Sequence, residues 1–195
     1  MVIETERLIL RPWRASDAEP FAALNADPDV MEFFPARKTR AESDAQMERM
    51  AGDLARTGFG LWALEERGGA PFIGFTGTSR PGFRAHFTPC IEVGWRLARA
   101  FWGRGYATEA ASAALDDLFA RDAACAEVVS MTAVGNRRSR AVMERLGMTR
   151  DPADDFDHPN VPPESPVHRH VLYRLARAAW IWRPTKPAGG SRRLH

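Results

Sequence analysis

The stretch AFWGRGYATEAA, residues 100–111, decides the predicted fold. Gly103 and Gly105 flank Arg104, and Tyr106 follows directly before an alanine-rich run. Apolar side chains recur at helical spacing over 107–119, which predicts a helix that begins behind a glycine-rich turn. A helix N-terminus presents unpaired N–H groups and the positive end of the helix dipole. The stretch therefore predicts a site for a phosphate group.

Three kinds of phosphate ligand compete for this site. The chain has no GxxxxGK[ST] run, which excludes a P-loop. Gly103 and Gly105 match the first two places of the dinucleotide pattern GxGxxG, but Thr108 takes the third and no N-terminal βαβ unit surrounds it. A nicotinamide dinucleotide is therefore an alternative ligand whose binding motif is incomplete in this sequence. The third ligand is the diphosphate of an acyl-coenzyme A, which the neighbouring segments favour.

The segments around this stretch alternate between strand and helix patterns. A capping box is expected at Ser16 and Glu19, and a second at Thr39 and Glu42. Strands are predicted over 7–13, 59–66, 71–79, 88–98, 126–134 and 168–176, and helices over 16–24, 27–34, 39–58, 107–119 and 136–146. This order predicts an α/β fold with a mixed sheet, in which the passage from 88 to 134 is a parallel crossover.

Length and composition restrict the class of protein. The 195 residues are 45% hydrophobic and 27% charged with a net charge of +2, which predicts one globular domain over 1–182 and a basic, flexible tail over 183–195. The small net charge of +2 does not suggest nucleic acid as the primary ligand. A membrane segment is not expected, because no apolar run approaches about 20 residues. Cys90 and Cys125 lack metal-ligand spacing and are expected as free thiols in the cytoplasm.

Two longer segments carry a resemblance to a known family. GWRLARAFWGRGYATEA (94–110) followed by NRRSRAVMERLGM (136–148) resembles the GNAT superfamily of acyl-CoA-dependent N-acetyltransferases, and more narrowly its RimJ/RimL-type branch. The opening ETERLILRPWRASDAEPF and the late DFDHP and RHVLYRL are similar to that branch too. The resemblance covers about residues 3 to 176. It implies a largely antiparallel mixed sheet with helices on both faces.

The resemblance also implies where acetyl-CoA binds. In the family pattern Gln/Arg-x-x-Gly-x-Gly/Ala, Trp102 takes the first place, and the strand before the loop pairs with the pantetheine arm, with a bulge expected at Gly94. Asn136 and Ser139 match a second cofactor-contacting helix, although Asn136 is also explained as an N-cap. The implied cofactor-binding residues are Trp95, Arg96, Leu97, Gly103, Arg104, Gly105, Tyr106, Ala107, Thr108, Asn136 and Ser139.

The implied reaction is direct attack of a primary amine on the thioester, through a tetrahedral intermediate. The acceptor is a protein N-terminal α-amine or a small-molecule amine. Many relatives protonate the leaving thiolate with a tyrosine, but Met143 holds that place here, so Ser139 is the candidate acid; the alternative is a bond to its own helix. Glu92 is the candidate base, because it points away from its apolar neighbours Ile91 and Val93 on a strand that feeds the site. Its alternative is a cross-strand ion pair.

Acceptor selection is expected elsewhere in the chain. The acidic stretch 151–159 is suited to steer an ammonium group. Phe33, Phe34 and Trp62 are either pocket or core residues, and the histidines at 158, 168 and 170 make no metal set, so no metal is expected. The alternative functions are a non-catalytic acyl-CoA-binding sensor or interaction module, a nicotinamide oxidoreductase and a nucleic-acid binder. Either a monomer or a homodimer fits.

Overall fold

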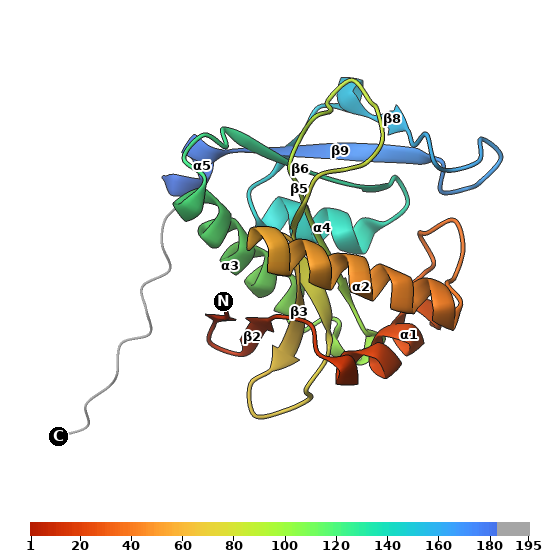
Figure 1. The fold of residues 1–195 in the computed structure, drawn as a ribbon. Coiled ribbons are helices and arrows are strands. Elements are labelled where there is room, and N and C mark those ends of the chain that lie inside the picture. The colour runs from red at the N-terminus through yellow and green to blue at the C-terminus, as the bar shows by residue number, and fades with distance from the viewer. Residues whose placement is uncertain (183–195) are drawn as a thin grey trace.

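A nine-stranded sheet in the order β1-β2-β3-β4-β5-β6-β9-β7, with β8 also paired to β9, forms the centre of the molecule (Figure 1). The computed structural model describes residues 1–182, and the predicted tail over 183–195 lies outside them. The strands are β1 Ile3–Glu4, β2 Leu8–Arg11, β3 Leu61–Glu66, β4 Gly74–Ser79, β5 Glu92–Leu97, β6 Glu127–Ala133, β7 Thr149–Arg150, β8 Phe156–Asp157 and β9 Arg169–Ala176. Within residues 1–182, only β5 and β6 pair in parallel. The predicted mixed, largely antiparallel sheet is confirmed.

Helices cover both faces of this sheet (Figure 1). They are α1 Ala18–Ala26, α2 Arg40–Thr57, α3 Tyr106–Arg121, α4 Arg137–Arg145 and α5 Arg177–Ile181. Side chains alternate across each strand, so one strand serves two cores. Val93 of β5 packs with residues of α3 and α4, whereas Phe75 of β4 packs with Phe21 of α1 and Met50 of α2. The α3/α4 face and the α1/α2 face are therefore distinct, and both meet at β5.

The local predictions are mostly confirmed. All six predicted strands and the helices over 39–58, 107–119 and 136–146 are present, and the Thr39–Glu42 capping box forms in both directions. The predicted helix over 27–34 is wrong, because the Asp27 carboxylate accepts the N–H groups of Asp29 and Val30 and holds a turn instead. Short strands β1, β7 and β8 were not predicted.

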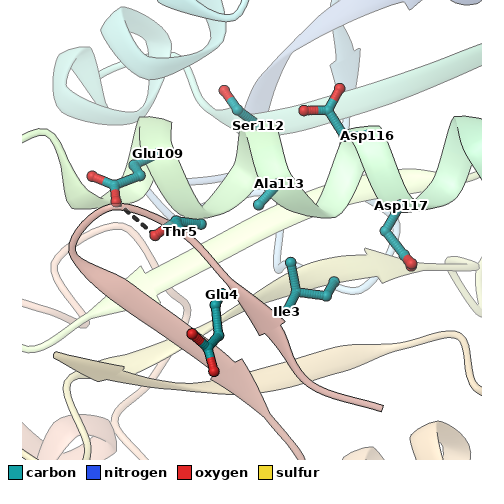
Figure 2. A pocket seen from close by; sticks show the side chains of 8 residues that line it. All are labelled: Ile3, Glu4, Thr5, Glu109, Ser112, Ala113, Asp116 and Asp117. Carbon is teal, nitrogen blue, oxygen red and sulfur yellow. Dashed lines mark hydrogen bonds between the residues drawn. The ribbon is translucent and has the colours of Figure 1, made fainter. Parts of the chain in front are cut away.

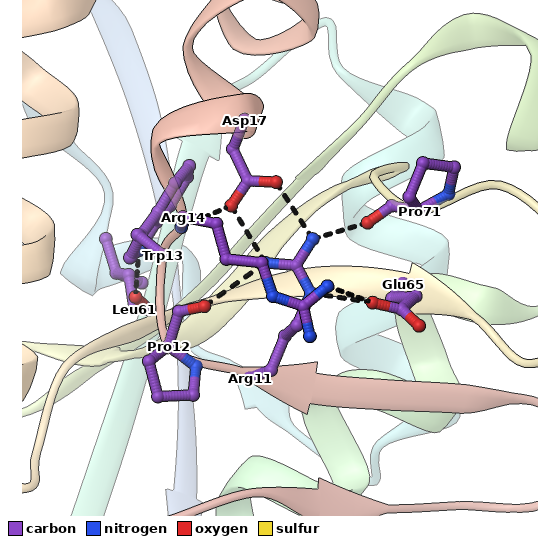
Figure 3. A network of polar contacts seen from close by, with 8 residues as sticks. All are labelled: Arg11, Pro12, Trp13, Arg14, Asp17, Leu61, Glu65 and Pro71. Atoms are coloured by element: carbon purple, nitrogen blue, oxygen red, sulfur yellow. Dashed lines mark hydrogen bonds and ion pairs between the residues drawn. The ribbon is translucent and has the colours of Figure 1, made fainter.

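The capping box predicted at Ser16 and Glu19 is also wrong. A 3₁₀ turn, η1 Ala15–Asp17, precedes α1, and the Asp17 carboxylate accepts the Arg14 N–H at 2.8 Å. Asp17 is drawn inward by the buried guanidinium of Arg11 (Figure 3). Nη1 and Nη2 of Arg11 donate to the two Asp17 oxygens at 2.8 Å each, and Nε donates to Glu65 at 2.7 Å. This network ties β2, η1 and β3 together.

A second polar contact holds the N-terminal chain against α3. Thr5 Oγ1 donates to Glu109 at 2.6 Å, as Figure 2 shows, and Arg7 Nε donates to the same carboxylate at 2.7 Å. Thr5 and Glu109 line a shallow surface pocket between the N-terminal chain and α3. Two further acids of this pocket are engaged: Asp117 pairs with Arg121, and the buried Trp180 indole donates to Asp116 at 2.9 Å. The bonds from Thr5 and Arg7 to Glu109 thus hold the first turn of α3, next to the glycine-rich loop, against the N-terminal chain.

Candidate active site

The parallel strands β5 and β6 diverge directly after they meet. Their one recorded pairing within residues 1–182 is Glu92 opposite Val129, where the Val129 N–H donates to the Ile91 carbonyl at 2.9 Å. Beyond this point, residues 94–97 and 130–132 line a cavity of about 1030 Å³ instead of bonding to each other. The sheet therefore opens in its middle, between β5 and β6.

The open edge of β5 presents backbone groups to this cavity. Carbonyl and N–H groups of alternate residues point to the same edge of a strand, so those of Trp95 and Leu97 follow the Ile91 carbonyl toward β6. The backbone of Arg96 faces β4 instead. The β4–β5 register runs without interruption from Gly74 opposite Leu97 to Ser79 opposite Glu92, so the bulge predicted at Gly94 is wrong. The opening comes from divergence of β6.

The glycine-rich loop forms the end of the cavity at α3. Gly103 and Gly105 adopt φ values of 74° and 79°, which side chains other than glycine rarely adopt. Gly105 caps α3 without a side chain, and the first helical bond runs from the Glu109 N–H to the Gly105 carbonyl at 3.1 Å. The N–H groups of residues 106–108 therefore have no acceptor in the helix, and these residues line the cavity. This arrangement fits a diphosphate.

The side chains of the loop are held by contacts with neighbouring groups. Trp102 Nε1 donates to the Leu97 carbonyl at 2.8 Å, and the Arg138 guanidinium lies 4.6 Å from the centroid of its ring. The Tyr106 phenol donates to Glu66 at 2.5 Å, and Arg104 lies 3.5 Å from the same carboxylate. The loop thus offers its backbone to the cavity, while these side chains hold its shape.

Helix α4 places Asn136 and Ser139 at the cavity wall. Asn136 Oδ1 accepts the Ser139 N–H at 3.1 Å, and its Nδ2 donates to Thr132 Oγ1 at 2.9 Å, which confirms the predicted N-cap. The Ser139 hydroxyl makes no recorded hydrogen bond within residues 1–182, so the alternative bond to its own helix is absent there. The hydroxyl is therefore available to a bound molecule.

Neither tyrosine of the chain replaces the one missing at Met143. Met143 is buried at 1% exposure and lines the cavity. Tyr106 bonds to Glu66 on the outer side of the loop, and Tyr173 donates to Glu144 at 2.9 Å. Since both phenols are engaged elsewhere, Ser139 is the hydroxyl donor that α4 offers to the cavity.

Glu92 lines the cavity where β5 and β6 separate. Its neighbours Ile91 and Val93 lie in the core on the α3/α4 face, as alternation predicts. The half-buried carboxylate makes no recorded hydrogen bond or ion pair with residues 1–182, so the alternative cross-strand ion pair is absent from that part of the chain. Removal from water raises the pKa of Glu92 to about 7. A carboxylate with this pKa can accept a proton near neutral pH.

Aromatic side chains and two histidines line the α1/α2 side of the cavity. Phe33 and Phe34 are lining residues, whereas Trp62 is a core residue at 1% exposure. The rings of His158 and His170 lie 4.8 Å apart between centroids. Burial lowers the pKa of both, that of His170 to about 4, so both are neutral at pH 7.

Sequence reasoning considered these histidines only as metal ligands. Within residues 1–182, no group of three or more candidate ligand side chains is placed to hold a metal. The β8–β9 pairing and the His158 N–H bond to the His168 carbonyl bring His158 beside His170. The two histidines lie in the DFDHP and RHVLYRL segments, which the sequence analysis singled out. The pairing of these segments was needed to show that the rings of His158 and His170 line the same cavity.

The acidic stretch 151–159 does not present free charges to the cavity. Asp154 bonds to Arg174 at 2.7 Å, Asp155 pairs with Arg150, and Asp157 lies 3.2 Å from Arg169. These arginines lower the pKa of Asp154 and Asp155. Arginines pair with three of the four acids of this stretch, whereas the exposed Asp151 carboxylate accepts the Ala153 N–H at 2.9 Å. Steering of an ammonium group by the stretch stays a prediction.

Comparisons with known proteins agree with this geometry. No described helix is long and apolar enough to cross a membrane. The chain is 31% identical over 196 aligned residues to the Aspergillus fumigatus FsC-acetyl coenzyme A-N(2)-transacetylase, covering 95% of this chain and 80% of the relative. It matches an Agrobacterium tumefaciens acetyltransferase structure with a TM-score of 0.71 and 27% identity, over 91% and 95% of the two chains.

A further solved structure shares the fold. It is the ribosomal L7/L12 alpha-N-protein acetyltransferase RimL in complex with coenzyme A, with a TM-score of 0.71, 16% identity and coverage of 92% and 99%. The family model described as an acetyltransferase (GNAT) domain matches residues 7–149, most of the chain. The chain therefore belongs to the GNAT acetyltransferase family and is an N-acetyltransferase.

Proposed function

We propose that this protein transfers the acetyl group of acetyl-CoA to a primary amine, either a protein N-terminal α-amine or a small-molecule amine. The observation that carries the proposal is one continuous cavity. It joins the uncapped N-terminus of α3, the open edge of β5 and the unpartnered carboxylate of Glu92. The first two features suit a CoA thioester, and the third suits an amine that must lose a proton.

Acetyl-CoA supplies a thioester carbonyl when it is bound. In the proposal, the N–H groups of Tyr106, Ala107 and Thr108 bind the diphosphate, and those of Gly103 and Arg104 complete the loop around it. The backbone of Trp95 and the N–H of Leu97 pair with the pantetheine arm as a further strand in the gap, while the Leu97 carbonyl accepts the Trp102 indole N–H. Asn136 orients α4 and keeps Ser139 at the wall of the cavity.

Proton transfer falls to two side chains. The ionised carboxylate of Glu92 takes a proton from the acceptor, whose α-amine has an ordinary pKa near 7.7–8.0. The Ser139 hydroxyl donates toward the departing sulfur. Because a general base or acid each contributes about 10²–10⁴-fold, a weak acid at this position slows turnover without abolishing it.

The finer placement in the RimJ/RimL-type branch belongs to the same proposal. It rests on the sequence motifs over 4–21, 94–110 and 155–175. The similarity to the RimL structure adds no support for the branch, because at 16% identity it shows only a shared fold. A cytoplasmic location is proposed with it, supported by the free thiols of Cys90 and Cys125. Acetylation of N-terminal peptides, compared with polyamines and amino acids in one panel, tests the branch directly.

A non-catalytic acyl-CoA sensor is the second candidate, favoured by Met143 in the usual tyrosine position. Both candidates predict that acetyl-CoA raises the Tm, whereas NAD and DNA do not. Release of free thiol in the presence of amines separates them, because a sensor leaves the thioester intact. The absence of both a Tm shift and binding heat at millimolar acetyl-CoA would exclude the two together.

Replacing Gly105 by valine should abolish acetyl-CoA binding. A β-branched residue at φ 79° distorts the turn that aims the first N–H groups of α3. Gly68→Val is the matched control, because Gly68 has φ 71° in the β3–β4 turn and open space around it. The Gly68→Val variant introduces similar backbone strain at a site far from the glycine-rich loop. Calorimetric titration should show binding by the control variant and none by Gly105→Val; equal affinity in both would contradict the assignment.

Replacing Ser139 by alanine should lower kcat about 10²-fold, near the lower end for loss of a general acid. The N-cap should survive, because Asn136 accepts the backbone N–H of Ser139 and not its hydroxyl. The Kd for acetyl-CoA and the Tm are therefore expected to stay near the wild-type values. Stopped-flow thiol release measures the effect, and an unchanged kcat would remove Ser139 from the mechanism.

A further inference from the structure

Arg96 places a cation in the cavity without a carboxylate partner. Its Nη1 donates to Asn25 Oδ1 at 2.5 Å, and its guanidinium carbon lies 4.0 Å from the centroid of the Phe34 ring and 5.4 Å from that of Phe75. Its Nε is buried without a hydrogen-bond partner. No ion pair to Arg96 is recorded within residues 1–182. Burial lowers the pKa of Arg96 to about 10, so it stays charged at neutral pH.

The guanidinium lies on the acceptor side of the sheet. Its partners Asn25 and Phe34 belong to the α1 region, whereas the glycine-rich loop leads into α3 on the opposite face. A CoA diphosphate at the loop therefore does not explain this charge. Leaving a buried cation unpaired is costly, so an anion that enters the cavity on this side gains by pairing with it.

Glu92, Gly94 and Arg96 line up along the same face of β5. Their outer Cα atoms are about 13 Å apart at the usual rise per residue in a strand. A Cβ built on Gly94 would meet no atom within 4 Å, so the space between the two charged side chains is open. One end of this row is the carboxylate of Glu92, and the other is the guanidinium of Arg96, which has no carboxylate partner within residues 1–182.

We propose that the acceptor carries a carboxylate as well as its amine, and that Arg96 binds the carboxylate while the amine lies toward Glu92. This assignment rests on the proposed function, since it names the class of amine that the same cavity acetylates. The planar fork of arginine matches a carboxylate through paired hydrogen bonds. Phe34 stacks on the guanidinium and orients it. Arg96 is thus a specificity-determining residue.

The test compares each acceptor with a matched uncharged form. Amino acids with one to five carbons between amine and carboxylate are assayed beside their amides, and N-terminal peptides with Asp at the second place beside peptides with Asn. The first set represents a small amino-carboxylate, and the second a protein N-terminus. Wild-type enzyme should show a kcat/KM at least about 10-fold higher for the acid in one of the two sets, with the difference mainly in KM.

Arg96→Gln should reduce that preference about 10- to 100-fold, and Arg96→Lys should retain part of it because the charge remains. Arg49→Gln removes the same charge from an exposed site on α2 and should leave the preference intact. The Kd for acetyl-CoA reports on folding of each variant. Equal rates for acids and amides in the wild type, or a preference that survives Arg96→Gln, would overturn the inference while the acetyltransferase stands. Absence of acetyl-CoA binding would instead refute the proposed function.

Discussion

Replacing Glu92 by glutamine is expected to lower kcat about 10²–10⁴-fold while the Kd for acetyl-CoA stays unchanged. Glutamine keeps the size of the side chain but cannot accept the proton of the incoming amine. The diphosphate loop and the open edge of β5 do not depend on this carboxylate, so cofactor binding should survive. Glu48→Gln, at an exposed site on α2, is the matched control and should have wild-type kinetics.

The pH profile adds a second readout for Glu92. Its pKa is raised to about 7, so the base is ionised above that pH and kcat should rise through pH 7 to a plateau. Two other ionisable groups that line the cavity titrate far from pH 7, since burial lowers the pKa of His170 to about 4 and that of Arg96 to about 10. Burial also lowers the pKa of His158. The limb near pH 7 should disappear in Glu92→Gln. A limb that persists in the variant would assign it to another group.

The same substitution should change stability in the opposite direction to activity. A folded-state pKa above the ordinary value of 4.5 means that the unfolded chain releases its proton first, so this group makes the protein less stable as pH rises from about 4.5 to 7. Glu92→Gln removes that cost. The free energy of unfolding of the variant relative to wild type should therefore increase between pH 4 and pH 8, as measured by urea denaturation.

Replacing Arg11 by alanine should produce the largest loss of stability, about 3–5 kcal/mol. Arg11 and Asp17 are 2% and 1% exposed, and the substitution leaves the Asp17 carboxylate buried without its cation. It also removes the contacts to Glu65 and to the Pro71 carbonyl, which join β2 to the β3–β4 hairpin (Figure 3).

The control for Arg11 is an exposed ion pair. Arg56→Ala removes the contact to Asp53 on the surface of α2 and should cost less than about 1 kcal/mol. Urea denaturation of both variants gives the comparison. If Arg11→Ala cost no more than Arg56→Ala, the network would not hold the N-terminal strand to the sheet.

Periodicity predicted most of the helices and strands, and the resemblance to the GNAT superfamily implied the largely antiparallel sheet with helices on both faces. The strands and the helices α2, α3 and α4 depend on local patterns, and the Thr39–Glu42 capping box closes within a single turn. The box expected at Ser16 had the same local signal. It failed because Asp17 pairs with Arg11, a contact that pattern rules for helix ends do not include.

In the candidate site too, local features were predicted and long-range ones were missed. Cofactor roles for the loop over 103–108 and for Asn136 were predicted from the resemblance to the family, and these roles depend on neighbouring backbone groups. The acceptor side was not predicted, because it is assembled from α1, β5, β8 and β9, which lie far apart in the sequence. Arg96 was assigned from its place in a motif, whereas its side chain lies on the opposite face from the loop that the motif describes. Only the register of β5 reveals that position.

The central claim is that the gap between β5 and β6 holds acetyl-CoA and delivers its acetyl group to an amine. Mass spectrometry of a reaction with acetyl-CoA and the amine panel, with free thiol measured in parallel, tests it most directly. The account predicts acetylated amine and free thiol in equal amounts, with both lost in Gly105→Val. Binding of acetyl-CoA without any acetylated product across the panel would contradict it.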